Sequence, residues 1–240
     1  MLSFIVPAHN EERWIGQCLH SIRATMASVA EPYEVIVVDD ASTDSTHQIA
    51  QQMGVRTLQV AHRKISAVRN AGAHAASGEI FFFVDADTQV NERAVRGALC
   101  ALREGAAGGG CLIDLDGPTP VWGRIILFLA VPMARLIQWA GGCFQFCTRE
   151  AFNTTGGFSE NLYAGEDIAF CQALKKAGRF VVLKPRVITS GRKLNVVSPW
   201  ELMVLMLTIA LRGPRYESKW ILDILYGQRA QDSKKPVKVA

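Results

Sequence analysis

Short apolar runs alternate with amphipathic segments through the first part of the chain. Runs such as YEVIVVDD (33–40) and EIFFFV (79–84) are apolar at almost every position, and the segments between them carry apolar side chains at helical spacing. Strands that are buried on both faces have this composition, and short connections between them favour crossover helices. We therefore predict an α/β fold with a doubly wound, mostly parallel sheet and helices on both faces. The expected strands are 2–7, 33–40, 55–60 and 79–84, and the expected helices are 11–28, 65–76 and one from a cap at Ser42 to about 53.

The second half of the chain has a looser pattern, which predicts a smaller, mixed region. No internal repeat or low-complexity linker separates the halves, so we expect one domain over 1–230, divided near residue 104. The tail 231–240 is polar and expected to be flexible. The strand-like segments are 106–115, 141–149 and 179–188, and the helix-like segments are 121–140, 165–177 and 198–212.

Composition narrows the class of protein. With 240 residues, of which 49% are hydrophobic and 20% charged, the chain can bury a substantial core. A net charge of +4 without an arginine-rich run argues against a nucleic-acid partner. The six cysteines are scattered and form no zinc-binding set, which favours reduced, mostly buried thiols in a cytosolic protein. The N-terminus lacks a basic start and is not expected to be a signal peptide.

Two apolar stretches, 125–134 and 202–211, require comparison with membrane helices. Each has about half the length that a spanning helix needs, so neither is expected to cross a bilayer. Helices in the protein core are one interpretation, and helices that lie in a membrane interface are the other.

The stretch FFFVDADTQV (81–90) ends an apolar strand with two acidic residues, Asp85 and Asp87, on either side of Ala86. Ligands of open α/β sheets bind beyond the carboxyl ends of the strands, where these residues are expected to lie. Both carboxylates could face one hard cation such as Mg²⁺ or Mn²⁺, or one could bind the cation and the other a ribose hydroxyl. A solvated acidic turn is the simpler alternative.

Three further stretches are expected at the same edge of the sheet: VPAHNEE (6–12), VVDDASTDST (37–46) and ISAVRNAGAHAASGE (65–79). The glycine-rich fingerprint of dinucleotide-binding folds is absent after the first strand. Carboxylates at the end of 33–40 could accept hydrogen bonds from a base or ribose, and Arg69 could reach a diphosphate or a base edge. Helix caps and a solvated arginine would explain each stretch separately, but explain their joint occurrence less well.

Taken in order, the motifs P-A-x-N-E, V-V-D-D-x-S-x-D-x-T, A-x-R-N-x-G, D-A-D and G-G-F…G-E-D resemble those of glycosyltransferase family 2, over about residues 2–190. That family consists of inverting enzymes of the GT-A fold that use nucleotide sugars. The resemblance implies that Asp85, Ala86 and Asp87 bind the ribose and a diphosphate-bridged Mg²⁺ or Mn²⁺. It also implies a nucleotide site lined by Pro7, Ala8, Asn10, Glu11, Asp39 or Asp40, and Arg69.

Glu166 and Asp167 start an amphipathic helix in GGFSENLYAGEDIAFCQAL (156–174). Acidic residues at a helix N-terminus stabilise the helix dipole, which is one explanation for them. The family resemblance implies another, in which Asp167 is the general base that takes the proton of the acceptor hydroxyl. Glu166 would then contact the acceptor or hold the loop.

The sequence departs from many relatives in one respect. They carry a late histidine that ligates the metal, whereas the stretch VITSGRKLN (187–195) has none and instead carries Arg192 and Lys193. These two residues could bind the diphosphate directly, or they could be a basic pair on the surface.

The expected activity is therefore transfer of a sugar from a UDP- or GDP-sugar to an acceptor in cell-envelope polysaccharide or glycolipid synthesis. A sugar-phosphate nucleotidyltransferase and a non-catalytic nucleotide-sugar binding module are the alternatives. The acceptor is expected to be a lipid, lipid-linked or saccharide molecule. Aromatic and basic residues around the apolar segments 121–140 and 198–226 suggest peripheral contact with the cytoplasmic face of a membrane, with a homodimer contact as the competing explanation.

Overall fold

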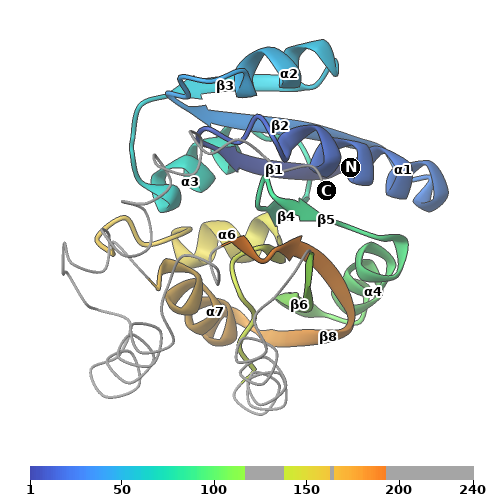
Figure 1. Ribbon diagram of the computed structural model, residues 1–240. Helices are drawn as coiled ribbons and strands as arrows, with labels where there is room; N and C mark the ends of the chain where they lie inside the picture. Colours follow the sequence, from blue (N-terminus) through green and yellow to red (C-terminus); the bar gives the residue numbers. More distant parts are fainter. Residues whose placement is uncertain (117–137, 163–164, 193–240) are drawn as a thin grey trace.

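One eight-stranded mixed sheet runs through the part of the chain that the computed structural model describes, residues 1–116, 138–162 and 165–192 (Figure 1). Its strand order is β3-β2-β1-β4-β7-β6-β8-β5. The strands are β1 (Leu2–Ala8), β2 (Tyr33–Asp40), β3 (Arg56–Val60), β4 (Ile80–Val84), β5 (Thr88–Gln89), β6 (Ala106–Asp116), β7 (Phe144–Thr148) and β8 (Arg179–Ser190).

The first half forms the predicted parallel layer. β1 pairs in parallel with β2 and β4, and β2 pairs in parallel with β3. The connections are crossover helices, because each parallel neighbour must start again at the same edge. They are α1 (Ile15–Val29), α2 (Thr46–Gln52) and α3 (Ile65–Ala75). The doubly wound prediction for this half is confirmed.

The second half is mixed, as predicted. β7 is antiparallel to both β4 and β6, while β6 and β8 are parallel. Three helices accompany these strands: α4 (Glu92–Arg103), α6 (Arg149–Thr155) and α7 (Glu166–Ala177). Strand β5 and helices α4 and α6 were not predicted from the sequence. Signals for α4 were present, since the side chain of Asn91 accepts a hydrogen bond from the backbone of Ala94 and its buried residues recur at helical spacing.

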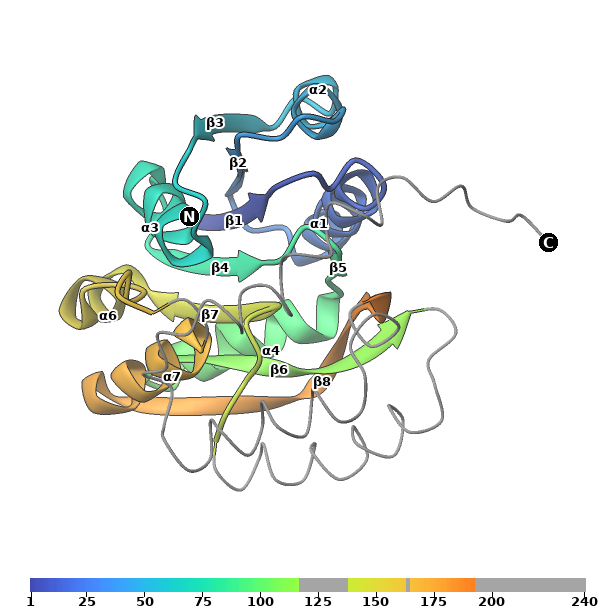
Figure 2. The same ribbon diagram turned by 60° about the vertical axis from the view of Figure 1, so that its left-hand side comes forward.

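The helices cover both faces of the sheet (Figure 2). α1 and α4 pack on one face, in a core that includes Phe4, Phe82 and Phe146. α3, α6 and α7 pack on the other face, in a core that includes Phe81, Phe83 and Phe170. Consecutive phenylalanines of β4 thus point to opposite faces, which explains why this strand is apolar at every position.

Several local predictions differ from the structure. Helix α1 begins at Ile15 rather than residue 11, and Ser42 does not cap α2, which starts at Thr46. The hydroxyl of Ser42 instead accepts a hydrogen bond from the backbone N–H of Asn10, since the loops after β1 and β2 pack together. All six cysteines are free thiols, as predicted, and four of them are buried.

Some predicted elements fall outside the described residues. These are most of the helix predicted at 121–140, the helix predicted at 198–212, the segment 198–226 and the tail 231–240. Residues 138–140 are described and are not helical. Among the helices of the described ranges, none has the length and apolar character needed to cross a bilayer.

Candidate active site at the carboxyl ends of the strands

The Asp85–Asp87 turn joins the middle of the sheet to its edge. β4 lies beside β7, but β5, which follows only a few residues later, pairs with β8 at the end of the sheet. The backbone N–H of Asp85 donates to the carbonyl of Cys143 (3.1 Å), and the carbonyl of Asp87 accepts from the N–H of Ser190 (3.2 Å). The two aspartates are therefore fixed to different strands, and their segment is a turn rather than extended chain.

Arg69 is a buried charged residue at the centre of this region. Its side chain is 2% exposed, and Nη2 lies 2.8 Å from Asp85 Oδ1 while Nη1 lies 3.1 Å from Glu166 Oε1. Nη2 also donates to the carbonyl of Gly142 (3.1 Å), and the ring of Phe158 lies 5.2 Å from Cζ. Burial alone would lower the pKa of Arg69, but the charges of Asp85 and Glu166 outweigh it and raise the pKa above its usual value. Arg69, on α3, thus joins two other predicted site residues, Asp85 of the β4–β5 turn and Glu166 of α7.

Gly142, which has no side chain, leaves room for the side chain of Arg69. A Cβ atom on Gly142 would lie 2.8 Å from Arg69 Nη2 and 3.2 Å from Asp167 Cβ. Gly142 is therefore part of the site, because any side chain there would displace the arginine or the helix start. Sequence reasoning did not identify it, since its role depends on residues distant in the chain.

The Glu166–Asp167 pair is held in two different ways. Glu166 turns toward Arg69, whereas Asp167 accepts hydrogen bonds from the backbone N–H groups of Gly142 (3.0 Å) and Ile168 (2.8 Å). Burial raises the pKa of both carboxyl groups, and each is also raised by neighbouring acidic charge. Capping of α7 explains only the bond from Ile168, so the helix dipole does not account for the whole arrangement.

Arg192 binds the second aspartate of the turn. Its Nη2 atom lies 2.6 Å from Glu11 Oε1 and 3.0 Å from Asp87 Oδ2. Burial would lower the pKa of Arg192, but the hydrogen bond that it donates to Glu11 and the nearby acidic charges raise it. Arg192 belongs to the stretch 187–195, which has no histidine. It contacts two predicted site residues, so the interpretation of Arg192 as part of a surface basic pair is wrong. Lys193 lies outside the described residues.

Most of the remaining predicted residues lie at the carboxyl ends of β1 and β2 or in the loop after β1. Asp40 Oδ1 accepts from the backbone N–H groups of His62 (2.7 Å) and Arg63 (3.1 Å). Asp39 is 1% exposed and accepts from the backbone N–H of Ser42 (3.1 Å). Both aspartates therefore have structural partners, in addition to any contact with a base. Pro7 and Ala8 are the buried last residues of β1, and Ala8 is in register with Asp39.

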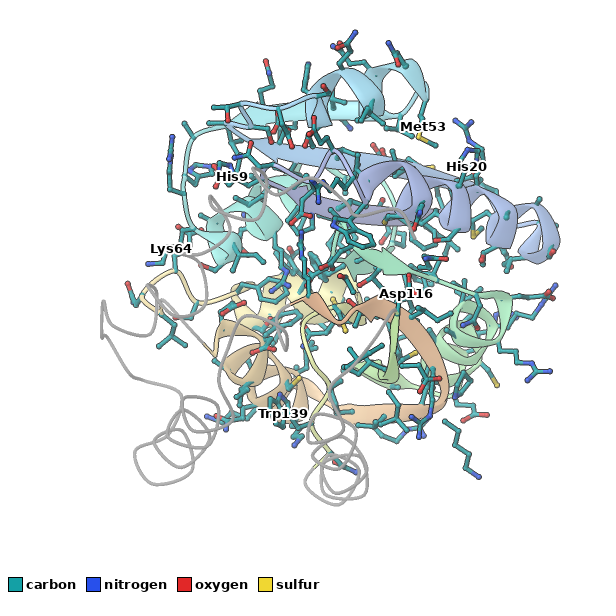
Figure 3. The ribbon with its side chains drawn as sticks, viewed as in Figure 1. His9, His20, Met53, Lys64, Asp116 and Trp139 are labelled. Atoms are coloured by element: carbon teal, nitrogen blue, oxygen red, sulfur yellow. The ribbon has the colours of Figure 1, made fainter. Side chains whose placement is uncertain are left out.

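Asn10 and Glu11 connect the loop after β1 to the loop after β2. Asn10 has a positive φ of 55°, and its side-chain oxygen accepts from the backbone N–H of Thr43 (2.8 Å). The backbone N–H of Glu11 donates to Thr46 Oγ1 (2.7 Å). His9 and Lys64, labelled in Figure 3, lie on the side of the molecule where the loops after β1 and β3 emerge.

The donor set for a cation consists of two carboxylates. Within residues 1–116, 138–162 and 165–192, no group of three His, Cys, Asp or Glu side chains could hold a metal ion. Asp85 and Asp87 each contact an arginine. Such a pair suits Mg²⁺ or Mn²⁺ only where substrate phosphates complete the ligand shell, which is the usual form of Mg²⁺ sites at nucleotides.

An α/β sheet with carboxylates and arginines gathered at the carboxyl ends of its strands is typical of nucleotide-binding enzymes. Residues 3–162 match the glycosyl transferase family 2, and the chain belongs to this family. The match covers β1 to β7 and all the motifs except that of Glu166 and Asp167.

Two curated relatives are similar to this chain in sequence. The poly(ribitol-phosphate) beta-N-acetylglucosaminyltransferase TarS of Staphylococcus aureus (strain Mu50) is 33% identical over 108 residues, 42% of this chain and 19% of TarS. The 4,4'-diaponeurosporenoate glycosyltransferase of S. aureus (strain USA300) is 38% identical over 93 residues, 36% of this chain and 24% of that relative. The matched region thus spans a quarter or less of these curated relatives.

The solved structures confirm the GT-A fold. The structure of TarS residues 1–349 with UDP-GlcNAc has a TM-score of 0.62 and 21% identity, and the match covers 94% of this chain and 70% of that one. The mannosyltransferase PcManGT from Pyrobaculum calidifontis, in complex with GDP-Man and Mn²⁺, has a TM-score of 0.66 and 18% identity, with 98% and 76% covered.

Proposed function

We propose that the protein is an inverting glycosyltransferase that moves a sugar from a nucleoside diphosphate to an acceptor hydroxyl. The observation that carries this proposal is the position of Arg69 between Asp85 and Glu166. One buried arginine ties the donor-side turn to the start of α7, where Asp167 lies. The arrangement supports the proposal, since it would hold the proposed donor site next to the proposed proton acceptor.

Asp167 is the general base in this proposal. It takes the proton of the acceptor hydroxyl as that oxygen attacks the anomeric carbon from the face opposite the diphosphate. The new glycosidic bond forms while the bond to the diphosphate oxygen breaks, and the leaving nucleoside diphosphate keeps the bonding electrons. A single displacement inverts the anomeric centre and needs no nucleophile of the enzyme. The raised pKa of Asp167, caused by burial, makes it a stronger base than an exposed aspartate.

The two hydrogen bonds to Asp167 fix its orientation without removing its basicity. Each oxygen accepts one backbone N–H, and a carboxylate oxygen has a second lone pair available. Glu166 is held by Arg69 and cannot swing freely, so we assign it the role of positioning the acceptor side of the site.

The donor in this proposal is a UDP- or GDP-sugar. Asp85 and Asp87 would hold Mg²⁺ or Mn²⁺, which when bound offsets charge that develops on the leaving diphosphate. Asn10, Asp39 and Asp40 would contact the nucleoside, because they lie at or just after the carboxyl ends of the neighbouring parallel strands β1 and β2.

The acceptor is proposed to be a lipid, lipid-linked or saccharide molecule of the cell envelope, reached at the cytoplasmic face of the membrane. The names of the relatives support this class, since one acts on poly(ribitol-phosphate) and the other on diaponeurosporenoate. The apolar segments 121–140 and 198–226, with their tryptophans and arginines, provide the second argument.

Donor hydrolysis tests the proposed function. The purified chain is incubated with a panel of UDP- and GDP-sugars with and without Mn²⁺, and slow release of free sugar and nucleoside diphosphate is expected. Nucleotide binding measured by thermal shift, without release of sugar from any donor or with any acceptor tested, would indicate a binding module. Formation of nucleotide sugar from a nucleoside triphosphate and a sugar phosphate would indicate a nucleotidyltransferase. Absence of nucleotide binding would contradict the proposal altogether.

A further inference from the structure

A positively charged side chain, that of Arg192, contacts Asp87, an aspartate that the family resemblance assigns to the metal. The same nitrogen of Arg192, Nη2, contacts Glu11 and Asp87. The side chains of Glu11 and Asp87 are 7% and 6% exposed, whereas that of Arg192 is 23% exposed. The two buried carboxylates are thus bridged by a guanidinium that solvent can reach.

Asp87 is held firmly by residues of β8. Asp87 Oδ1 accepts from Thr189 Oγ1 (3.4 Å), and its backbone carbonyl accepts from the N–H of Ser190. Thr189 is itself bound to Thr88 across the β5–β8 pair (3.0 Å). Arg192 follows the end of β8 and has a long, rotatable side chain. When the contact between Arg192 and Asp87 changes, Arg192 is therefore the residue that moves.

A divalent cation and the guanidinium compete for Asp87. A positive ion bound to Asp87 Oδ2 would stand within a few ångströms of Nη2, where like charges repel. An incoming diphosphate adds negative charge beside Asp87. It also offers Arg192 a new partner, since a guanidinium binds phosphate oxygens through two parallel hydrogen bonds.

The excess of acidic groups in the site also couples cation binding to nucleotide binding. Two arginines, Arg69 and Arg192, face five carboxyl groups. A donor diphosphate would make this imbalance larger, so the site gains more from a further cation when the nucleotide is present. The five carboxyl groups are those of Glu11, Asp85, Asp87, Glu166 and Asp167.

We infer that Arg192 takes the place of the divalent cation on Asp87 in the nucleotide-free protein and leaves it for the diphosphate when the donor binds. The inference rests on the proposed function, because it needs a diphosphate ligand. Exchange of Arg192 makes cation binding and nucleotide binding mutually dependent. By linkage, the factor by which nucleotide tightens the cation equals the factor by which the cation tightens nucleotide.

Mn²⁺ binding without nucleotide tests the exchange directly. Free Mn²⁺ is measured by electron paramagnetic resonance during titration of the wild type and of Arg192→Gln. We expect Arg192→Gln to bind Mn²⁺ about tenfold more tightly or better, because Asp87 loses its competing cation. Arg192→Lys keeps the positive charge and should bind Mn²⁺ as weakly as the wild type. Arg186→Gln is the matched control, since Arg186 lies on β8, six positions before Arg192, but is exposed and pairs with Asp114 (2.8 Å).

A second measurement follows the coupling itself. The affinities for UDP and GDP are measured in Mn²⁺ and in EDTA, and the ratio should be about tenfold or more for the wild type and smaller for Arg192→Gln. Mn²⁺ should also raise the melting temperature of Arg192→Gln more than that of the wild type, because Glu11 and Asp87 are left without their shared cation. Should Arg192→Gln fail to fold, Arg192→Met supplies the neutral variant with a similar apolar stem.

The outcomes separate this inference from the proposed function. Equal or weaker Mn²⁺ binding by the neutral variant, with UDP or GDP bound normally, overturns the exchange and leaves the transferase intact. Tighter Mn²⁺ binding by the variant, with neither nucleotide bound by any form, supports competition at Asp87 but contradicts the proposed function.

Discussion

Asn70 and Phe158 exchange two hydrogen bonds, each 2.9 Å long, between the Asn70 side-chain amide and the Phe158 backbone. The amide thus forms the two hydrogen bonds that a neighbouring strand would form with the Phe158 backbone. These bonds link α3 to the loop after α6. Gly157, with a φ of 75°, leaves room for Asn70 Oδ1, which a Cβ atom would approach to 2.7 Å. This contact explains why the motifs R-N and G-G-F occur together: Asn70 places the Phe158 ring beside Arg69.

Asn70→Ala should therefore destabilise the protein and loosen the site. The backbone N–H and carbonyl of Phe158 would lose their partner while buried, which typically costs about 1–3 kcal/mol. Denaturant unfolding measures this loss, and Asn153→Ala is the control because that asparagine is exposed. Equal stability of the two variants would show that the Asn70 bonds contribute nothing.

The two aspartates of the turn should respond differently to substitution. Asp87→Asn should abolish turnover with little change in stability, because Arg192 keeps its ion pair with Glu11. Asp85→Asn should abolish turnover and also lower stability, since Arg69 is buried and would lose one of its two carboxylate partners. About 1–3 kcal/mol is expected, less than for a fully buried pair because the Asp85 side chain is 19% exposed. Turnover retained in both variants would exclude a donor role for the turn.

Asp167→Asn tests the general base. The variant keeps the size of the side chain but cannot take the proton, so transfer should fall by about 10²–10⁴-fold while nucleotide binding stays nearly unchanged. Asp114→Asn, an exposed change on β6, is the matched control. The assignment is reversed if Glu166→Gln is inactive and Asp167→Asn transfers sugar.

The acid limb of the pH profile should reflect the buried carboxyl pair. Because burial raises the pKa values of Glu166 and Asp167, the base becomes protonated at a higher pH than an exposed aspartate, and transfer should fall as pH decreases through that raised value. Stability should respond in the opposite sense. An acid with a higher pKa in the folded than in the unfolded state favours folding when protonated, and this advantage is lost as pH rises through the folded pKa.

Both quantities are measured between about pH 4 and 8, as kcat/KM and as melting temperature. The pair titrates as a unit, so the profile gives its apparent pKa values rather than that of either residue. An acid limb at the pKa of an ordinary exposed aspartate would contradict the role of burial.

Membrane contact is the remaining prediction. Liposomes with anionic lipid should co-sediment with the protein at low salt and release it at high salt, because basic flanks of an interfacial helix act through screened charge. Neutral liposomes provide the control. Lack of binding at low salt, together with a concentration-dependent dimer in solution, would assign the apolar segments 121–140 and 198–226 to self-association.

The parallel half of the sheet and the motifs at its edge could be predicted from the pattern of apolar residues. Strands 2–7, 33–40 and 79–84 were predicted to within one residue of β1, β2 and β4, because burial on both faces forces a continuous apolar run. The residues that border those runs could be placed together, since parallel strands end at one edge, and the family resemblance then implied that they line a nucleotide site. Helix α4 was missed although Asn91 and its apolar spacing were visible.

The contacts between charged side chains depend on the packing of strands and helices that are distant in the chain. Asp85 and Asp87 lie two positions apart, yet one contacts Arg69 on α3 and the other Arg192 beyond β8. Arg192 also reaches Glu11, 181 positions away in the chain. Periodicity reports whether a strand is buried, but it does not report which strand lies beside it. The placement of β5 against β8, far from β4 in the sheet, is what separates the two carboxylates and gives each its own arginine.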